Sequence, residues 1–215
     1  MNHIANNGGK PIRVVLVDDH QLVREGLRVC LDAAAHIEVV GEAASGEEAL
    51  QVAAGVRPDL MLVDIGMRGM TGIRLAAIVR DTHPGIAVLM LSMYDNNEYV
   101  ANARHAGARG YVLKESPIGE IITAIEVVAA GGSYYSASVA PALEQPHTPT
   151  PELTGREYQV LLLVAHGHNN KTVAQELDIS VRTVESHRFA LRRKVGVDTA
   201  AGLLKYALER GLTRV

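Results

Sequence analysis

The chain has 215 residues, of which 47% are hydrophobic and 21% are charged. This composition is typical of a globular protein with room for one large domain or two small ones. The sequence has no apolar run of 18 or more residues and no charged-then-apolar leader, which argues against a membrane span and a secretory signal. The single cysteine, Cys30, excludes an internal disulfide. We expect Cys30 to be buried in an apolar helix and the protein to be cytoplasmic.

The net charge of −3 is unevenly distributed along the chain. Residues 1–150 hold 11 basic and 17 acidic side chains, a net charge of −6. Residues 151–215 hold 10 basic and 7 acidic side chains, a net charge of +3. An acidic first part followed by a basic second part indicates a nucleic-acid partner for the second part alone.

Strand and helix patterns alternate along the first 130 residues. After a polar tail at residues 1–11, short β-branched or apolar runs predict strands at 12–17, 37–43, 59–64, 86–91 and 109–113. Helical spacing of apolar residues predicts helices at 21–35, 46–55, 73–82, 96–106 and 117–130. Five such alternations predict an α/β fold in which a parallel sheet has helices on both faces.

The stretch 60–72, LMLVDIGMRGMTG, is typical of a strand buried on both faces that ends on one acid, Asp64, and opens into a glycine-containing loop. In the flavodoxin-like strand order 2-1-3-4-5, the ends of strands one and three flank the ligand crevice. Asp18, Asp19 and Asp64 would therefore converge there. Three carboxylates this close require a cation, and Mg²⁺, a hard dication with oxygen ligands, is the natural occupant.

This arrangement suits phosphoryl transfer, which needs an in-line nucleophile and positive charge on the equatorial oxygens. Asp64 is the expected phosphoacceptor. Lys114, at the end of strand five, and the hydroxyl of Ser92, at the end of strand four, would bind the transferred phosphoryl group. The expected Mg²⁺ ligands are the side chains of Asp18, Asp19 and Asp64 and the backbone carbonyl of Gly66. Taken singly, such residues are commonly caps, turns or solvated charges, so only their joint placement indicates a site.

These residues resemble the receiver domain of two-component response regulators over about residues 12–130. The resemblance is carried by Asp18-Asp19 after strand one, Asp64 in VDIGM, Ser92 after strand four and Lys114 in GYVLKE. It implies that a sensor histidine kinase phosphorylates Asp64. It also implies that Tyr111 is a switch residue, which turns inward when Ser92 shifts towards the phosphoryl group.

One position departs from the receiver pattern. Receivers commonly have proline just after the methionine of the phosphoacceptor loop, and this chain has Arg68 there. We expect Arg68 to alter the rigidity of the loop and not phosphorylation itself.

The regular pattern stops after residue 130, and four of the eight prolines fall between 131 and 152, which indicates an extended tether. Thr154 and Glu157 then form an expected capping box for a helix that ends at 165. Further helices are predicted at 170–177, 181–195 and 199–210, with Ser180 as the cap after the turn 178–180. A short helix, a tight turn and a basic second helix are typical of a helix-turn-helix.

Residues 153–212 resemble the four-helix DNA-binding domain of the LuxR type, through LTGRE, AHGHNNKTVAQEL, DISVRTVESH and LRRKVGV. With the receiver, nearly the whole chain resembles a response regulator of the NarL/FixJ family. The expected architecture is a flavodoxin-like (βα)5 receiver at 12–131, a linker at 132–152 and a small all-α helix-turn-helix domain of the LuxR type at 153–215.

The resemblance places the helix 181–195 in the major groove of double-stranded DNA. Three residues would face base edges, where glutamate can accept from cytosine and phenylalanine can touch a thymine methyl group: Glu185, Ser186 and Phe189. Five others are candidates for phosphate contacts, which supply affinity and salt dependence: Lys171, Arg182, Thr183, Arg188 and Arg192.

The sequence therefore predicts a DNA-binding response regulator, not an enzyme, that is switched by phosphorylation of Asp64 and controls transcription as a homodimer. The apolar face of the helix 199–210 fits a dimer contact and core packing equally well. An aspartate-nucleophile phosphatase ranks far lower, because Gly66 stands where a general acid would be needed. The alternative is a phosphorylation-independent regulator that uses its receiver only for dimerisation; the intact acidic pair, Ser92 and Lys114 argue against it.

Overall fold

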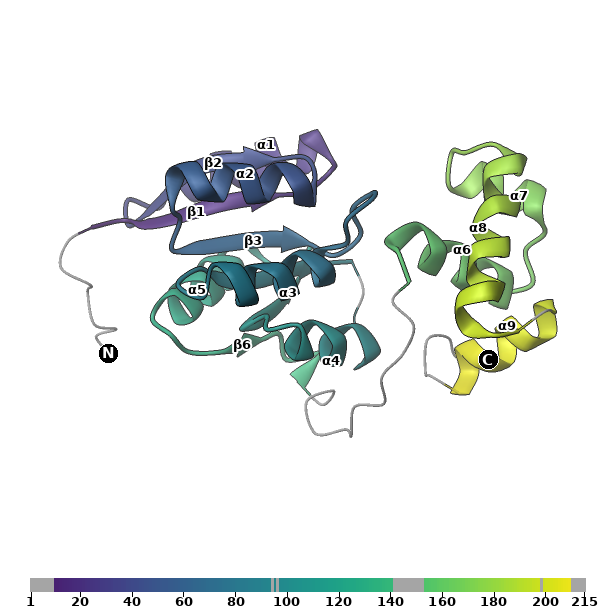
Figure 1. The fold of residues 1–215 in the computed structure, drawn as a ribbon. Coiled ribbons are helices and arrows are strands. Elements are labelled where there is room, and N and C mark those ends of the chain that lie inside the picture. Colours follow the sequence, from purple (N-terminus) through teal and green to yellow (C-terminus); the bar gives the residue numbers. More distant parts are fainter. Residues whose placement is uncertain (1–9, 94, 96, 141–152, 198, 210–215) are drawn as a thin grey trace. The chain divides into compact units, whose positions relative to one another are not determined.

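The structure is a computed structural model, and it describes residues 10–93, 95, 97–140, 153–197 and 199–209 (Figure 1). The chain divides into two compact units, residues 1–93 with 103–137 and residues 94–102 with 138–215. Within the described ranges, no helix has the length and apolar character needed to cross a membrane.

The first part of the chain forms a parallel sheet of strands connected by helices (Figure 1). The strands are β1 Ile12–Val17, β2 Ile37–Ala43, β3 Leu60–Asp64, β4 Ala87–Ser92, β5 Gly110–Leu113 and β6 Tyr134–Tyr135. The helices are α1 Gln21–Asp32, α2 Gly46–Val56, α3 Gly72–Thr82, α4 Asn97–His105 and α5 Ile118–Ala129. The strand order is β2-β1-β3-β4-β5-β6 with every pairing parallel, which confirms the flavodoxin-like order predicted for the first five strands.

The short strand β6 corrects the expectation that regular structure stops after residue 130. Tyr134 N donates to Arg109 O at 3.1 Å and Ser136 N donates to Tyr111 O at 3.0 Å, so this segment pairs with the edge of β5. A strand of two residues is too short to show an alternating pattern, so no periodicity in the sequence indicated it. The remainder of the predicted linker, residues 141–152, lies outside the described residues.

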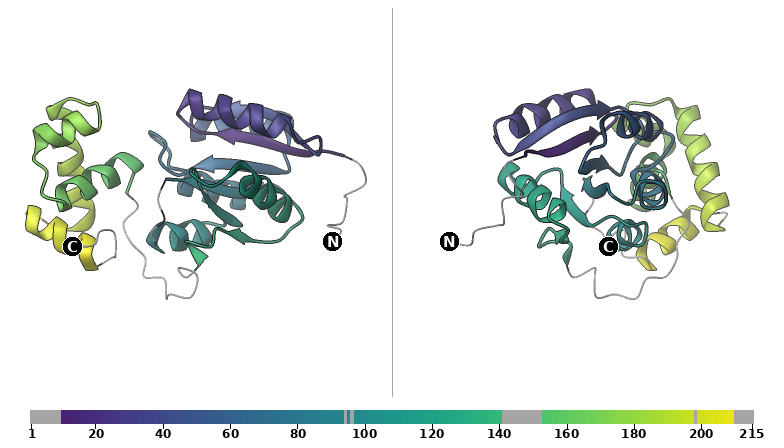
Figure 2. Two further views of the ribbon diagram at one scale, coloured as in Figure 1. Left: turned by 180° about the vertical axis from the view of Figure 1, so that it is seen from behind. Right: turned by 60° about the vertical axis from the view of Figure 1, so that its left-hand side comes forward.

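Helices cover both faces of the sheet (Figure 2). On one face, alternate strand residues such as Leu16, Leu62 and Leu91 pack with Leu31 of α1 and Ile125 of α5 in one buried cluster. The other face is covered by α2 and α3, which bury Ala53, Leu75 and Val79. All five residues of β3 are buried, as expected for a central strand covered on both faces.

The expectation that Cys30 is buried is wrong, because this thiol is exposed. The inward face of α1 and the chain after it is set by Leu27, Leu31 and Ala34, which follow the i, i+4, i+7 spacing and pack on the core cluster. Cys30 falls outside that stripe, and neighbouring Val29 is 73% exposed. An apolar run therefore marked the helix correctly but did not say which of its residues face inward.

The second part of the chain is helical, with α6 Gly155–Ala165, α7 Asn170–Glu176, α8 Val181–Val195 and α9 Ala200–Glu209. The predicted capping box is confirmed: Glu157 N donates to Thr154 Oγ1 at 3.2 Å, and Thr154 N donates to Glu157 Oε2 at 2.7 Å. Helix α9 packs against α6 and buries Leu203, Tyr206 and Ala207, so most of its apolar face is used by the core. Its Leu208 is partly exposed.

Candidate phosphoacceptor site and nucleic-acid interface

The sheet register brings the predicted receiver residues to one edge. Val17 of β1 pairs with Val63 of β3, so Asp18 and Asp64 follow at the same level. Strand β4 ends at Ser92, and Lys114 N donates to Ser92 O at 2.8 Å, which fixes the end of β5 beside the end of β4. The carboxyl ends of β1, β3, β4 and β5 therefore lie side by side, although these strands are far apart in sequence.

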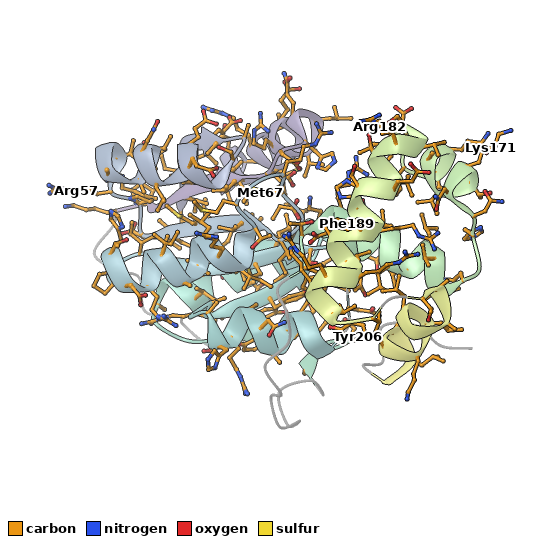
Figure 3. The ribbon with its side chains drawn as sticks, turned by 45° about the vertical axis from the view of Figure 1, so that its right-hand side comes forward. Arg57, Met67, Lys171, Arg182, Phe189 and Tyr206 are labelled. Carbon is orange, nitrogen blue, oxygen red and sulfur yellow. The ribbon has the colours of Figure 1, made fainter. Side chains whose placement is uncertain are left out.

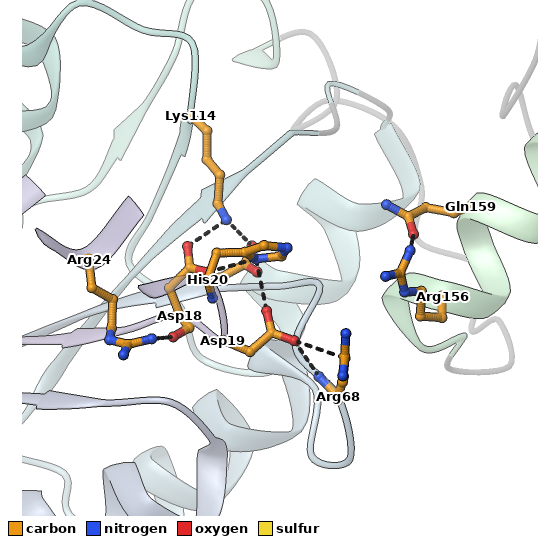
Figure 4. Close-up of polar contacts among 9 residues, drawn as sticks. Asp18, Asp19, His20, Arg24, Arg68, Lys114, Arg156 and Gln159 are labelled. Carbon is orange, nitrogen blue, oxygen red and sulfur yellow. Dashed lines mark hydrogen bonds and ion pairs between the residues drawn. The ribbon is translucent and has the colours of Figure 1, made fainter. Parts of the chain in front are cut away.

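The centre of the site is a buried group of two carboxylates and one ammonium. Lys114 Nζ lies 2.5 Å from Asp18 Oδ2 (Figure 4) and 3.2 Å from Asp64 Oδ1. The side chains of Lys114, Asp18 and Asp64 are 11%, 3% and 6% exposed. Burial raises the pKa of Asp64; the positive charge of Lys114 opposes this shift and the negative charge of Asp18 reinforces it. Lys114 thus offsets part of the electrostatic cost of placing two acids in the protein interior.

Asp19 lies at the rim of the same site and is partnered differently. Its Oδ1 is buried and has no hydrogen-bond partner, although the ring Nδ1 of His20 stands 3.0 Å away. Its Oδ2 accepts a hydrogen bond from the backbone N–H of Arg68 at 3.3 Å, and the Arg68 Nε lies 3.9 Å from the same oxygen (Figure 4). A buried carboxylate oxygen without a donor is suited to a cation.

Ligand atoms of Asp18, Asp19, His20 and Asp64 all lie within 4.8 Å of one another. Carboxylate oxygens are the ligands that Mg²⁺ prefers, so this acidic cluster is compatible with Mg²⁺ binding. His20 was not among the predicted residues. Its backbone N–H donates to Asp18 Oδ1 at 2.8 Å and its ring Nδ1 lies 3.1 Å from the same oxygen, so it holds Asp18 in place.

Two predicted switch residues are fully buried: Ser92 and Tyr111 each have 0% exposure. Tyr111 is thus already inside the protein, and an inward turn of its ring would have little exposed surface left to remove. Gly66, in the loop after β3, donates its backbone N–H to the Asp64 carboxylate, which opposes the rise in the pKa of Asp64.

Gly72, which was not among the predicted site residues, positions the backbone of Asp64. A Cβ atom added to Gly72 would lie 2.3 Å from the backbone oxygen of Asp64, so only glycine lets the start of α3 approach the end of β3 this closely. Thr71 caps α3 by accepting a hydrogen bond from Arg74 N. Arg24 Nη1 donates to the backbone oxygen of Asp18. The sequence carried a signal for Gly72, since glycine at a tight strand-to-helix connection indicates close backbone approach.

Helices α7 and α8 form the predicted helix-turn-helix. Asn169 caps α7 by accepting from Lys171 N and Thr172 N, each at 3.0 Å. Asp178, in the turn, has a φ of 49°, and Ser180 caps α8 by accepting from Thr183 N at 3.0 Å. One side-chain cap thus fixes the start of each helix of the motif.

The predicted DNA-contacting residues divide by exposure. Val184 and Leu191 of α8 are buried against the rest of the domain. Five of the predicted contacts are exposed: Lys171, Arg182, Glu185, Ser186 and Phe189. Figure 3 labels Lys171, Arg182 and Phe189. On α8 the last four of these recur at helical spacing, so they share one face, on which Phe189 is 69% exposed.

The other three predicted contacts are partly buried, and two basic residues of α8 are used within the domain. Arg188 Nη1 donates to Asn170 Oδ1 at 2.7 Å, which ties α8 to α7. Burial and the nearby charge of Arg192 lower the pKa of Arg188, and Thr183 and Arg192 are also half-buried. Lys194 Nζ lies 2.6 Å from the buried carboxylate of Glu157, so this basic residue stabilises the start of α6.

An acidic, lysine-containing site at the edge of a parallel sheet, followed by a helix-turn-helix, defines the class: a receiver domain joined to a DNA-binding domain. The family models agree. The model for the response regulator receiver domain matches residues 14–126, and the model for bacterial regulatory proteins of the luxR family matches residues 151–207. The chain belongs to the DNA-binding response regulators of two-component systems, a family of transcription regulators and not of enzymes.

Similar proteins span the whole chain. The transcriptional regulatory protein MctR of Rhizobium johnstonii is 41% identical over 203 residues, covering 94% of this chain and 95% of that protein. The crystal structure of the response regulator ChrA of a heme-sensing two-component system has a TM-score of 0.54 at 34% identity, covering 94% of this chain and 99% of that one. The structure of the response regulator RcsB in complex with DNA has a TM-score of 0.60 at 25% identity, covering 93% and 98%.

Proposed function

We propose that a sensor histidine kinase phosphorylates this regulator on Asp64, and that the modification controls its binding to DNA. The observation that carries the proposal is the buried carboxylate of Asp64, 3.2 Å from Lys114 Nζ at the edge of the sheet. An Asp64 oxygen attacks the phosphorus of a phosphohistidine; a P–O bond forms, the P–N bond breaks, and the imidazole leaves with the electron pair of that bond. The product is an acyl phosphate on Asp64.

The other residues of the site have separate roles. Asp18, Asp19, Asp64 and the backbone carbonyl of Gly66 would hold Mg²⁺, which when bound neutralises charge on the phosphoryl oxygens. Lys114 and the hydroxyl of Ser92 contact the transferred group. The buried ring of Tyr111 adjusts to the new position of Ser92. Phosphorylation of Asp64 thereby shifts Ser92 at the end of β4 and Tyr111 in β5.

Helix α8 enters the major groove of double-stranded DNA. Glu185, Ser186 and Phe189 face base edges, a role supported by their exposure on one face of the helix. The phosphate contacts are Lys171, Arg182, Thr183, Arg188 and Arg192. For Arg188 and Arg192, which are half-buried, this requires their guanidinium groups to reach outward from the domain surface. The likeness to RcsB, whose structure with DNA is known, supports this docking.

We keep the domain limits that the sequence pattern predicts: a receiver at 12–131, a linker at 132–152 and a LuxR-type domain at 153–215. A homodimer forms on phosphorylation or on a two-fold DNA site, as the RcsB dimers bound to DNA suggest. The protein acts in the bacterial cytoplasm, the compartment that holds the DNA.

The test compares native protein with Asp64→Asn, each with and without a small-molecule phosphodonor plus Mg²⁺. We expect mass spectrometry to find one added phosphoryl group on the native chain only, and DNA binding or dimerisation to tighten only in that sample. Identical DNA binding in all four samples would contradict control by phosphorylation. It would leave a constitutive DNA-binding protein that uses its receiver for dimerisation.

A further inference from the structure

The loop between β3 and α3 places a cation against one predicted metal ligand. Arg68 is the fourth residue after Asp64, and its side chain is 78% exposed. Its backbone N–H donates to Asp19 Oδ2 at 3.3 Å and its Nε lies 3.9 Å from that oxygen (Figure 4). Both contacts reach the same carboxylate oxygen, one from the backbone and one from the side chain.

The three carboxylates of the site have different positively charged neighbours. Lys114 Nζ forms ion pairs with Asp18 and Asp64, and neither of these contacts involves Asp19. The cations beside Asp19 are Arg68, which is charged at all working pH values, and His20, which is charged only when protonated. Arg68 therefore stands where it can partly neutralise Asp19.

The two contacts have different physical consequences. The hydrogen bond from the backbone N–H holds Oδ2 against the loop. It leaves the buried Oδ1, which accepts no hydrogen bond and has only the His20 ring Nδ1 3.0 Å away, available to a cation. The guanidinium adds a positive charge at the rim of the site, and that charge repels any cation held by Asp19. A proline at position 68 would supply neither contact, because it has no N–H and no charge.

We infer that Arg68 is a positioning residue for Asp19 whose guanidinium lowers the affinity of the receiver for Mg²⁺. This inference rests on the proposed function, because it takes Asp19 to be a metal ligand. It makes occupation of the site more dependent on the free Mg²⁺ concentration than in a receiver without a cation at this place. Because the side chain is exposed, the effect must weaken as salt screens it.

The test measures Mg²⁺ binding to the full chain by isothermal titration calorimetry, for native protein, Arg68→Ala and Arg68→Lys. Arg68→Ala should tighten Mg²⁺ binding by about three- to tenfold at low salt, the scale of one exposed charge near a divalent cation. The gain should shrink as the salt concentration rises to about 0.15 M. Arg68→Lys, which keeps the charge, should stay within about twofold of native.

Two further variants separate the contributions. Arg80→Ala removes one exposed positive charge from the last turn of α3, at the opposite end of that helix from the site, and should leave Mg²⁺ affinity unchanged. Arg68→Pro removes both the charge and the N–H donor, so its gain in affinity should be smaller than that of Arg68→Ala. Equal affinities of Arg68→Pro and Arg68→Ala would show that the backbone contact does not position Asp19.

The outcomes are distinguishable from failure of the proposed function. If native protein does not bind Mg²⁺ at all, the proposed metal site is wrong. If native protein binds but Arg68→Ala binds equally or more weakly at low salt, the inference about Arg68 is overturned while the metal site stands. A gain in Arg80→Ala equal to that in Arg68→Ala would attribute the effect to net charge and would also overturn the inference.

Discussion

The receiver edge and helix α8 hold their functional charges in opposite ways. At the receiver edge, Asp18, Asp64 and Lys114 have nearly buried side chains that pair with one another across three strand ends. On α8, Arg182 and Glu185 are exposed and belong to one continuous helix. The first site exists only once the sheet has folded, whereas the second is set by local sequence. Substitutions at the receiver edge should therefore change stability and switching together, and substitutions on the outer face of α8 should change binding alone.

The largest effect is expected from removing the buried cation. Lys114→Ala leaves Asp18 and Asp64 together without a counter-charge, so the free energy of unfolding at neutral pH should fall by roughly 3–5 kcal/mol. Phosphodonor-dependent DNA binding should be lost as well. Urea denaturation without Mg²⁺ measures the first effect, and Lys10→Ala, which removes an exposed lysine, is the matched control. A loss of less than about 1 kcal/mol would mean that these buried charges interact no more strongly than a surface ion pair. That result would contradict the expected difference between the receiver edge and α8.

A smaller loss is expected from the backbone that supports Asp64. Gly72→Ala places a methyl group 2.3 Å from the Asp64 backbone oxygen, so α3 or β3 must shift, at a cost of about 1–3 kcal/mol. Gly55→Ala is the control, because that helical glycine has open space around its Cβ position. The control should be neutral or stabilising by up to about 1 kcal/mol, since alanine favours helix. Equal melting temperatures of the two variants would show that the close approach at Gly72 is not needed.

The pH dependence of stability tests the buried carboxylate directly. Burial raises the pKa of Asp64 in the folded protein, so the folded state binds this proton more tightly than the unfolded state does. The stability that Asp64 contributes is thus present below its ordinary pKa of 3.8 and is lost as pH rises through the raised value. Asp64→Asn should therefore gain stability relative to native over that rise, by about 1 kcal/mol. Urea titrations in a metal chelator, at several pH values from 4 to neutrality, measure this difference; a relative gain by native protein would contradict it.

The same contrast explains how far the sequence could predict the molecule. Strand-end residues such as Asp64 and Lys114 were predictable because strand order and register are determined by apolar runs that the sequence displays. β6 was missed because two residues carry no periodicity, and its pairing with β5 arises from tertiary structure alone. The approach of Arg68 to Asp19 joins two loops 49 positions apart, and no local pattern reports such a contact.

On α8, sequence reasoning identified the helix, its cap and its basic character but not the use of each cation. Arg188 was predicted to contact phosphate and Lys194 was given no role of its own, yet they bind Asn170 and Glu157 within the domain. Helical position alone cannot separate a charge that faces solvent from one that reaches across to a neighbouring helix. The assignment of phosphate contacts therefore stays a prediction, and it is strongest for the exposed members of the set.

The smallest effect is expected at one of those exposed members. Arg182→Ala removes an exposed side chain in the first turn of α8, whose guanidinium forms no hydrogen bond or ion pair with the residues that the structure describes. Stability should therefore stay within about 0.5 kcal/mol of native. DNA binding should weaken to a similar degree on all sequences, and the slope of log K against log salt should fall by about one, the value for one lost phosphate contact. Fluorescence anisotropy over a salt series measures both quantities. Arg193→Ala, an exposed arginine in the last turn of the same helix, should change the slope less. A loss confined to one DNA sequence would instead assign Arg182 to a base edge, because phosphates carry no sequence information.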